Sequence, residues 1–414
     1  MKNVSAFLKR HSALLLLVLV LATVPAGIAF GKYVKSVNVT SGISVTVEGE
    51  KEYIIDKGKM WTALQGLSAS NPTTLSFVKG SDAAGMRRVD TTGGGIQAEG
   101  SGEIGVYQSG TAVCIAPVEN DKAELYAPQD CSYFLYGKYT KLALGSISFS
   151  NLNTSKVESM YGMFDECTSL ETLDWGSFDT SNVTTMALMF RNCGQLASID
   201  LSGFKTGNVN SINQMFQGCT SLTELDLSGF DTSSLERMST AFGDCTSLTS
   251  INLNGFSASK VKIMQGVFDG CKSLTSLDLS SFDTSSALQM HYMFLNCTSL
   301  TELDLRGFNT GNVTQMKEMF LNCGNLKTIW VGSGFDTAKV TNGKDKNMFT
   351  GCTSLVGGNG TTYDSSYTGK TYARIDGGPN STTPGYFTGD LTTNSVTGTD
   401  EPANGFGLAL DPAS

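Results

Sequence analysis

The stretch CTSLTELDLSGFDTSSLERMSTAFGDC, residues 219–245, contains one complete unit of a repeat that runs through much of the chain. Its cysteine recurs at one constant interval at Cys167, Cys193, Cys219, Cys245, Cys271, Cys297 and Cys323, and Cys352 follows after a slightly longer interval. A constant period of this length is typical of a solenoid, in which each unit stacks on the next. We therefore expect function on a repeated surface rather than in one catalytic cleft.

Within a unit, the apolar spacing changes once. Leu225 and Leu227 alternate with polar residues, which predicts a short strand with both leucines facing the core. After it, apolar residues such as Leu235 and Met238 recur at three and four residues, which is typical of a helical or 3₁₀ segment. The predicted fold class is an α/β solenoid of 26-residue coils, each with one parallel strand and one helical segment.

The repeat marks the predicted domain boundaries. The solenoid should span 141–356, with one residue inserted before Phe335 and two before Met348 in its last coil. We expect a β-rich domain and cap at 30–140, a C-terminal cap at 357–388 and a disordered tail at 389–414. The aromatic run at 132–136 either caps the first coil or forms an ordinary strand of the N-terminal domain.

The N-terminus indicates an exported protein, and the net charge argues against two classes of partner. Residues 1–29 have the order of a signal peptide, with basic residues, an apolar run and then Ala26 and Ala29 as cleavage points, although the segment could also be retained. The net charge of −9 and the absence of a basic stripe argue against nucleic acid and anionic membranes as partners. No membrane contact is expected beyond the signal segment.

The ten cysteines invite a disulfide framework in a secreted chain. Side chains in stacked coils project in parallel, however, which fits disulfide geometry poorly, so the repeated cysteines should be free thiols in the core. Cys114 and Cys131 lie outside the repeat and could form a bridge. The histidines are His11, in the signal, and His291, expected at an exposed position, and CxxC pairs are absent. We therefore predict no metal, no cofactor and no catalytic residues.

One polar row is the candidate binding site. The outward strand position carries the residues Asp174, Asp200, Asp226, Asn252, Asp278 and Asp304. Aligned like charges on neighbouring strands are unfavourable. Three interpretations stay open: solvated residues relieved by serine and threonine neighbours, an acidic face for a partner, or a calcium site. Trp330 occupies the same row and is either an exposed binding anchor or covered by the C-terminal cap.

The unit C-x-x-L-x-x-L-D-L-S-x-F-D-T-S-x-V-x-x-M-x-x-M-F resembles the BspA-like branch of bacterial leucine-rich repeat surface proteins. The flanking segments SYFLY at 132–136, YARIDGG at 372–378 and PGYF at 384–387 are also similar to segments that bracket such arrays. The resemblance implies a leucine-rich repeat fold with the shape of a right-handed arc, and a role in adhesion to host proteins or other cells.

We therefore predict a non-enzymatic, adhesin-like recognition protein that is secreted or held at the bacterial cell surface. Its concave strand face would bind a protein or glycan of the host or of a neighbouring cell. One alternative is a structural component that self-assembles in a matrix or appendage. Another is a β-helix enzyme that acts on polysaccharide, although such an enzyme needs a cluster of acidic and basic residues that the regular repeat does not show.

Overall fold

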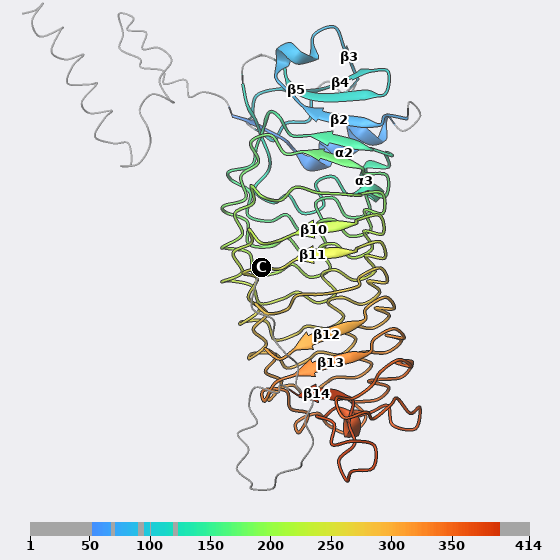
Figure 1. Cartoon of the computed structure of the whole chain (residues 1–414). Helices are drawn as coiled ribbons and strands as arrows, with labels where there is room; N and C mark the ends of the chain where they lie inside the picture. The colour runs from blue at the N-terminus through green and yellow to red at the C-terminus, as the bar shows by residue number, and fades with distance from the viewer. Residues whose placement is uncertain (1–51, 68–70, 90–94, 100, 119–122, 390–414) are drawn as a thin grey trace, which may run out of the picture.

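The computed structural model of the chain describes residues 52–67, 71–89, 95–99, 101–118 and 123–389. The predicted signal peptide at 1–29 lies outside the described residues, as does the predicted tail from residue 390 onward. Figure 1 shows the described part as an elongated column of coils stacked one above another.

Neighbouring coils pair as parallel strands whose partners are one repeat apart in the sequence. Strand β10 (Glu224–Asp226) pairs with β11 (Ser250–Asn252), with Leu225 opposite Ile251. Strand β12 (Glu302–Leu305) pairs in the same way with β13 (Thr328–Val331), with Asp304 opposite Trp330. Each coil thus places the same position of the repeat directly beside its equivalent in the next coil.

A second ladder of single parallel bridges runs along another side of the stack. Its members follow each other through Asp130, Ser159, Thr185, Ser211, Arg237, Ile263, Gln289 and Gln315. Backbone bonds on either side of each bridge extend the contact, for example from Met264 N–H to the Gln289 carbonyl at 2.9 Å. Backbone bonds therefore link neighbouring coils along two sides of the stack.

The segment expected to be helical is instead a chain of tight turns. Within residues 141–356, all of which the structure describes, there is no helix. Ala241 N–H donates to the Met238 carbonyl at 3.1 Å, and Thr240 and Asp244 adopt left-handed backbone angles, with φ of 52° and 56°. Between these turns, Phe242 N–H donates to the Val267 carbonyl of the next coil at 3.0 Å. Donors that bond to the next coil cannot close the i to i−4 bonds of an α-helix.

The N-terminal region is a mixed structure that joins the stack directly. Helix α2 (Lys57–Gln65) starts at Asp56, whose side chain accepts a bond from Lys59 N–H, and buries Met60 and Leu64. The other elements are β1 (Tyr53–Ile54), β2 (Thr74–Phe77), η3 (Gly80–Ala83), β3 (Arg87–Arg88), β4 (Ile104–Ser109), β5 (Ala112–Pro117), β6 (Leu125–Tyr126) and α3 (Gly137–Thr140).

One six-stranded sheet crosses the predicted boundary at residue 140. Its order is β3-β4-β5-β2-β7-β9, where β7 spans Ser146–Ser148 and β9 spans Thr172–Asp174. Strand β2 pairs with β7 in parallel, so the N-terminal region supplies a strand that the first coil extends. A smaller sheet, β1-β6-β8 with β8 at Leu152–Asn153, joins the two regions a second time. The N-terminal elements therefore cover the first coil rather than forming a detached unit.

The C-terminal segment covers the other end. After the short helix η4 (Lys370–Tyr372), strand β14 (Phe387–Gly389) adds to β13 in parallel, with Phe387 opposite Ile329. Tyr386 and Phe387 are fully buried, and the ring of Tyr386 lies 5.2 Å from that of Phe349. These two side chains close the apolar end of the last coil.

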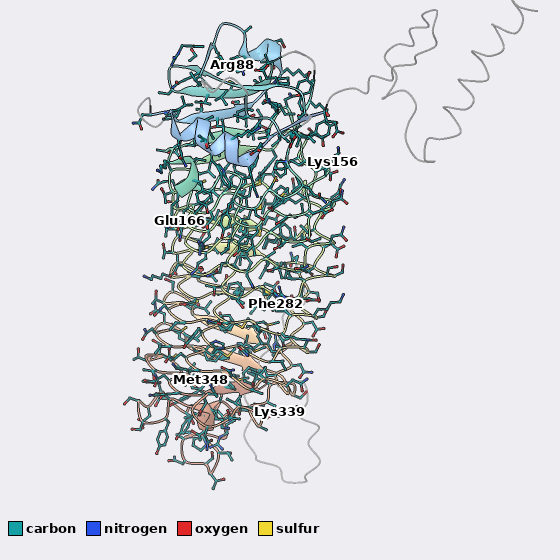
Figure 2. All side chains as sticks on the ribbon, turned by 180° about the vertical axis from the view of Figure 1, so that it is seen from behind. Arg88, Lys156, Glu166, Phe282, Lys339 and Met348 are labelled. Carbon is teal, nitrogen blue, oxygen red and sulfur yellow. The ribbon has the colours of Figure 1, made fainter. Side chains whose placement is uncertain are left out.

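The core of the array contains columns in which the same side chain recurs from coil to coil. Rings at the same position of consecutive coils stack nearly parallel, as in Phe268 and Phe294, whose centroids are 5.8 Å apart at 4°. Figure 2 shows Phe282, which belongs to a second aromatic column, within the stack and Lys156 at its edge. Burial of each ring contributes about 2–3 kcal/mol, so the stability of a coil depends on its neighbours. None of the helices in the described residues is both long and apolar enough to cross a membrane.

Candidate functional site

The predicted polar row lies on one face of the strand ladder. Asp226 is exposed at the end of β10 and sits opposite Asn252 of β11, while Leu225 and Leu227 are buried beneath it. Asp174, Asp200, Asp278 and Asp304 are likewise exposed, and Asn252 and Trp330 are half-buried. The structure thus brings the predicted residues onto a common surface, which we call the strand face.

The aspartates and Asn252 of this row also hold the turn that follows each of them. Asp226 Oδ1 accepts bonds from the N–H and the hydroxyl of Ser228, at 2.9 and 2.7 Å. The same bond to the N–H two residues later occurs at Asp174, Asp200, Asn252, Asp278 and Asp304. This is an Asx turn, so an acceptor oxygen at the position has a structural role whatever its charge.

These bonds favour the ionised form of four aspartates of the row. The hydroxyl and N–H of Ser228 lower the pKa of Asp226, and the same groups of Ser280 lower that of Asp278. The pKa of Asp304 is lowered first by the guanidinium of Arg306, whose Nη2 lies 2.6 Å from Oδ2. The relief of charge expected from serine neighbours therefore comes mainly from donors within each turn, and Asp200, Asp226, Asp278 and Asp304 keep their negative charge at neutral pH.

A hollow of about 530 Å³ opens in the middle of the strand face. Glu224, Asp226 and Asp278 contribute carboxylates to it, and the half-buried side chains Ile199 and Ile251 contribute apolar surface. Sequence reasoning missed Glu224 and the two isoleucines. The available signals were a glutamate at an outward strand position and isoleucine in place of the usual leucine. Carboxylates around an apolar patch can accept hydrogen bonds while the patch packs against a ligand.

Trp330 combines features of both predicted alternatives. It lies in β13 between Asp304 of β12 and Thr388 of β14. The C-terminal strand therefore runs beside the ring, yet the residue stays half-buried rather than fully covered. It remains accessible in part at the C-terminal end of the strand face.

The cysteine column lies inside the molecule. All ten cysteines are free thiols, and Cys114 and Cys131 do not form a bridge. The eight repeated cysteines are buried, and burial raises the pKa of Cys219 to about 12. Among the residues that the structure describes, no three His, Cys, Asp or Glu side chains gather as a metal site.

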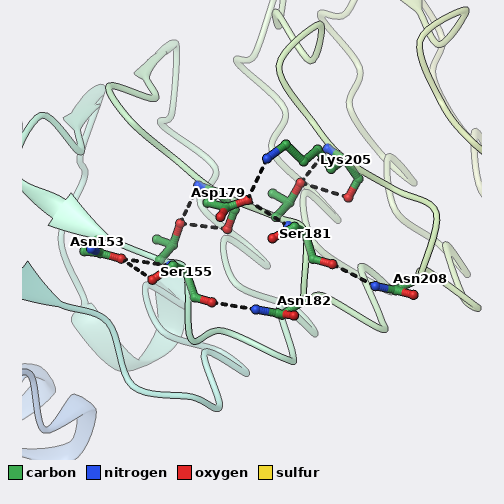
Figure 3. A network of polar contacts seen from close by, with 9 residues as sticks. Asn153, Ser155, Asp179, Ser181, Asn182, Lys205 and Asn208 are labelled. Carbon is green, nitrogen blue, oxygen red and sulfur yellow. Dashed lines mark hydrogen bonds and ion pairs between the residues drawn. The ribbon is translucent and has the colours of Figure 1, made fainter. Parts of the chain in front are cut away.

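The D-T-S turns join one coil to the next. Thr180 Oγ accepts a bond from Lys205 N–H at 2.7 Å and donates to the Lys205 carbonyl at 3.0 Å. Figure 3 shows the neighbouring part of this network, in which Asn182 Nδ2 donates to the Ser155 carbonyl at 2.7 Å. The equivalent threonines Thr206, Thr284 and Thr310 are buried. These threonines thus bond neighbouring coils to each other and are not exposed to a ligand.

The comparisons agree with a repeat protein. The sequence model of one family matches residues 133–253 and again residues 236–360, which together make up more than half of the chain. Two overlapping matches are expected of a repeat array, and they support a repeat surface-protein family. Neither the curated proteins nor the solved structures contain a match to the chain. The chain therefore belongs to the family described as Mycoplasma protein of unknown function, DUF285.

Proposed function

We propose that the protein is a BspA-like, adhesin-like recognition protein, secreted or held at the bacterial cell surface, without enzymatic activity. In this proposal the fold is a leucine-rich repeat solenoid, and its strand face binds a protein or glycan of the host or of a neighbouring cell. The observation that carries the proposal is the hollow in which Glu224, Asp226 and Asp278 surround Ile199 and Ile251.

The chemistry of this hollow favours a ligand with donor groups. The pKa values of Asp226 and Asp278 are lowered, and the turn bond of Asp278 uses Oδ1, so Oδ2 is available to a ligand. Amino groups, guanidinium groups and sugar hydroxyls are the matching donors. Half-buried isoleucines gain from packing against the apolar face of a sugar ring or a side chain. A basic peptide segment or a neutral glycan therefore fits better than an acidic ligand.

The test separates the charge of the row from its structural role. The protein is applied to host-matrix proteins and to a glycan array, together with the variant D200N/D226N/D278N/D304N. Asparagine keeps the acceptor oxygen of each Asx turn and removes its charge. We expect ligand capture by the protein and loss of that capture in the variant.

A matched control is available elsewhere in the same repeat. Asp179, Asp231, Asp283 and Asp336 hold equivalent turns through bonds to the N–H two residues later, but belong to the D-T-S row. The variant D179N/D231N/D283N/D336N also removes four negative charges, but from this other row. It should keep the binding. Equal loss in both variants would show that overall charge, rather than the strand face, controls capture.

The covered ends of the stack bear on the alternative of self-assembly. Strand β14 lies beside β13 at one end, and the strands β2 to β5 extend the sheet at the other. Covered ends support a discrete particle, because open strand edges are what drives end-to-end pairing. Small-angle scattering over a range of concentrations checks this point. A filament that lengthens with concentration would favour a structural matrix component instead.

A further inference from the structure

A second hollow, of about 460 Å³, lies beside the ladder of single bridges near the C-terminal end of the array. Its lining includes His291, Tyr292, Gln315, Lys317, Lys344 and Lys346, which we call the His291 pocket. Three lysines and a histidine thus gather in one place on a chain whose net charge is −9. No carboxylate belongs to this lining.

The irregular last coil builds the wall of the pocket. In the regular array, Met290 N–H donates to the carbonyl of Gln315 in the next coil. One coil further, Met316 N–H donates to Lys344, whereas a regular repeat would place Thr341 at that point. The last coil has three extra residues by the time the chain reaches Lys344. At Val340, the equivalent of Val313, it has only one. The other two extra residues therefore fall between Val340 and Lys344. The insertion therefore forms the segment that carries Asn342 and Lys344 into the lining.

The inserted segment has a defined shape. Gly343 takes a left-handed backbone conformation with φ of 82°, and its N–H donates to Asp345 Oδ1 at 3.2 Å. Asp345 Oδ2 accepts a bond from Lys370 N–H at 3.2 Å. The carboxylate between the two lysines is thus used by the backbone on both sides, and its bonds fix the loop rather than pairing with Lys344 or Lys346.

The lysines of the pocket are poorly neutralised. Lys317 Nζ lies 3.3 Å from Glu318 Oε1 and 3.4 Å from the hydroxyl of Tyr292. Lys344 and Lys346 are exposed, and neither forms an ion pair with a carboxylate among the described residues. Lys344 and Lys346, which have no carboxylate partner among the described residues, therefore line a hollow in which both would attract an anion.

His291 has an unusual environment for a residue of this lining. Its Nδ1 atom is buried and, within the described part of the chain, has no hydrogen-bond partner. The prediction of an exposed histidine is therefore wrong, because His291 is half-buried. Its ring packs edge to face with that of Tyr292, and the two ring centroids are 4.9 Å apart. A buried polar atom without a partner is destabilising.

We propose that the His291 pocket binds a sulfate or phosphate group, either free or as the end group of a larger ligand. The ammonium groups of Lys317, Lys344 and Lys346 bind its oxygens by charge-assisted hydrogen bonds, and the imidazole of His291 lies in the same lining. Gln315 and Asn342 offer amide donors at the edge of the same hollow. This site is separate from the strand face and has the opposite charge, so it does not depend on the function proposed for that face.

The test uses the full chain and follows the imidazole resonances of His291 by NMR. The protein is titrated separately with inorganic sulfate, inorganic phosphate and a sulfated disaccharide, at constant ionic strength set with chloride. His11 is the other histidine of the chain, and the variant His11→Gln identifies its signals. We expect a saturating shift at His291. Tighter binding of the disaccharide would identify a sulfated glycan as the source of the group, and equal or tighter binding of the free ions would identify the ions themselves.

Two double variants make the result specific. K344Q/K346Q removes two cations of the pocket, and its affinity for the group should fall about tenfold or more. K260Q/K262Q removes two exposed lysines with the same spacing outside the pocket and should bind as the unaltered chain does. Circular dichroism checks that both fold. The proposal is overturned if no probe gives a saturating shift at His291, or if K344Q/K346Q binds as tightly as K260Q/K262Q.

Discussion

The thiol of Cys245 donates a hydrogen bond to the carbonyl oxygen of Phe216, with Sγ and O 3.1 Å apart and both residues fully buried. The bond links one coil to the preceding one inside the core. The same contact recurs in the pairs Cys193–Phe164, Cys219–Phe190, Cys271–Phe242, Cys297–Phe268, Cys323–Phe294 and Cys352–Phe320. The cysteine is thus a core residue that also gives a buried carbonyl group a second hydrogen bond, beside the one from Cys219 N–H in the case of Phe216.

We predict that Cys245→Ala destabilises the protein by about 1–3 kcal/mol, because it leaves a small cavity and removes one of the two hydrogen bonds that the Phe216 carbonyl accepts. Urea unfolding followed by circular dichroism measures the loss. Cys114→Ala is the matched control, since Cys114 is only half-buried and lies outside the column. A smaller effect at Cys245 than at Cys114 would contradict the role given to the thiol.

The repeated thiols should also be chemically inert in the folded protein. Burial raises the pKa of Cys167, Cys219 and Cys323 to about 12, so the reactive thiolate is scarce at pH 8. An Ellman time course should show Cys114 reacting first, and the eight repeated cysteines only after denaturant is added. Rapid reaction of those eight thiols in the native protein would place them at the surface instead.

Asp269 is predicted to oppose folding at neutral pH. Its burial, followed by the charge of Asp244, raises its pKa from 3.8 to about 6. A carboxyl group whose folded pKa is raised favours the folded state at pH below 3.8, and that advantage is lost as the pH rises through 6. Asp269→Asn should therefore stabilise the protein at pH 8 by about 1 kcal/mol, after allowance for solvent screening, and have little effect at pH 4.

Thermal melts of Asp269→Asn at pH 4 and pH 8 check this expectation. Asp283→Asn removes an exposed carboxylate from a turn and serves as the control. The gain should appear at the higher pH and only at Asp269. A gain of the same size in both variants would mean that net charge, rather than the Asp244–Asp269 pair, is responsible.

The titration of His291 should depend on the neighbouring lysines. Burial, followed by the charges of Lys344 and Lys317, lowers its pKa from 6.5, and Lys346 and Tyr292 also face the ring. A histidine whose folded pKa is lowered disfavours the folded state as the pH falls below 6.5. Lys344→Gln should raise the pKa of His291 measured by NMR, and Lys260→Gln should leave it unchanged. If the pKa of His291 is unchanged in Lys344→Gln, the charge of Lys344 does not act on His291 and the prediction is wrong.

The period of the sequence predicts which residues lie side by side, because stacking in register places equivalent positions together. Leu225 and Ile251, for example, hold the same position in consecutive repeats and lie directly opposite each other. The strand face and its acidic row follow from the same argument. The expected helical segment does not, because apolar spacings of three and four also suit consecutive turns. Spacing does not reveal that Phe242 N–H bonds to the next coil.

Other features could be predicted from the sequence only in part or not at all. Strand β2 lacks the repeat motif, so its pairing with the first coil could not be inferred. The insertion before Met348 was visible as a break in the period, but not the direction in which its residues fold. His291 stands where other coils have small or polar residues, such as Ala187 and Asn213. The lengthened coil brings Asn342 and Lys344 into the lining of its pocket.

Stacking in register is the claim on which both sites depend, and distances between spin labels test it most directly. In a Cys114→Ser background, labels are placed at Ser202 and Arg306, four coils apart, and at Ser150 and Arg306, six coils apart. Strand spacing predicts backbone separations of about 19 and about 29 Å. Pulsed electron paramagnetic resonance should therefore give two mean distances that differ by about 10 Å. Equal distances, or a difference unrelated to two coil spacings, would contradict the stack.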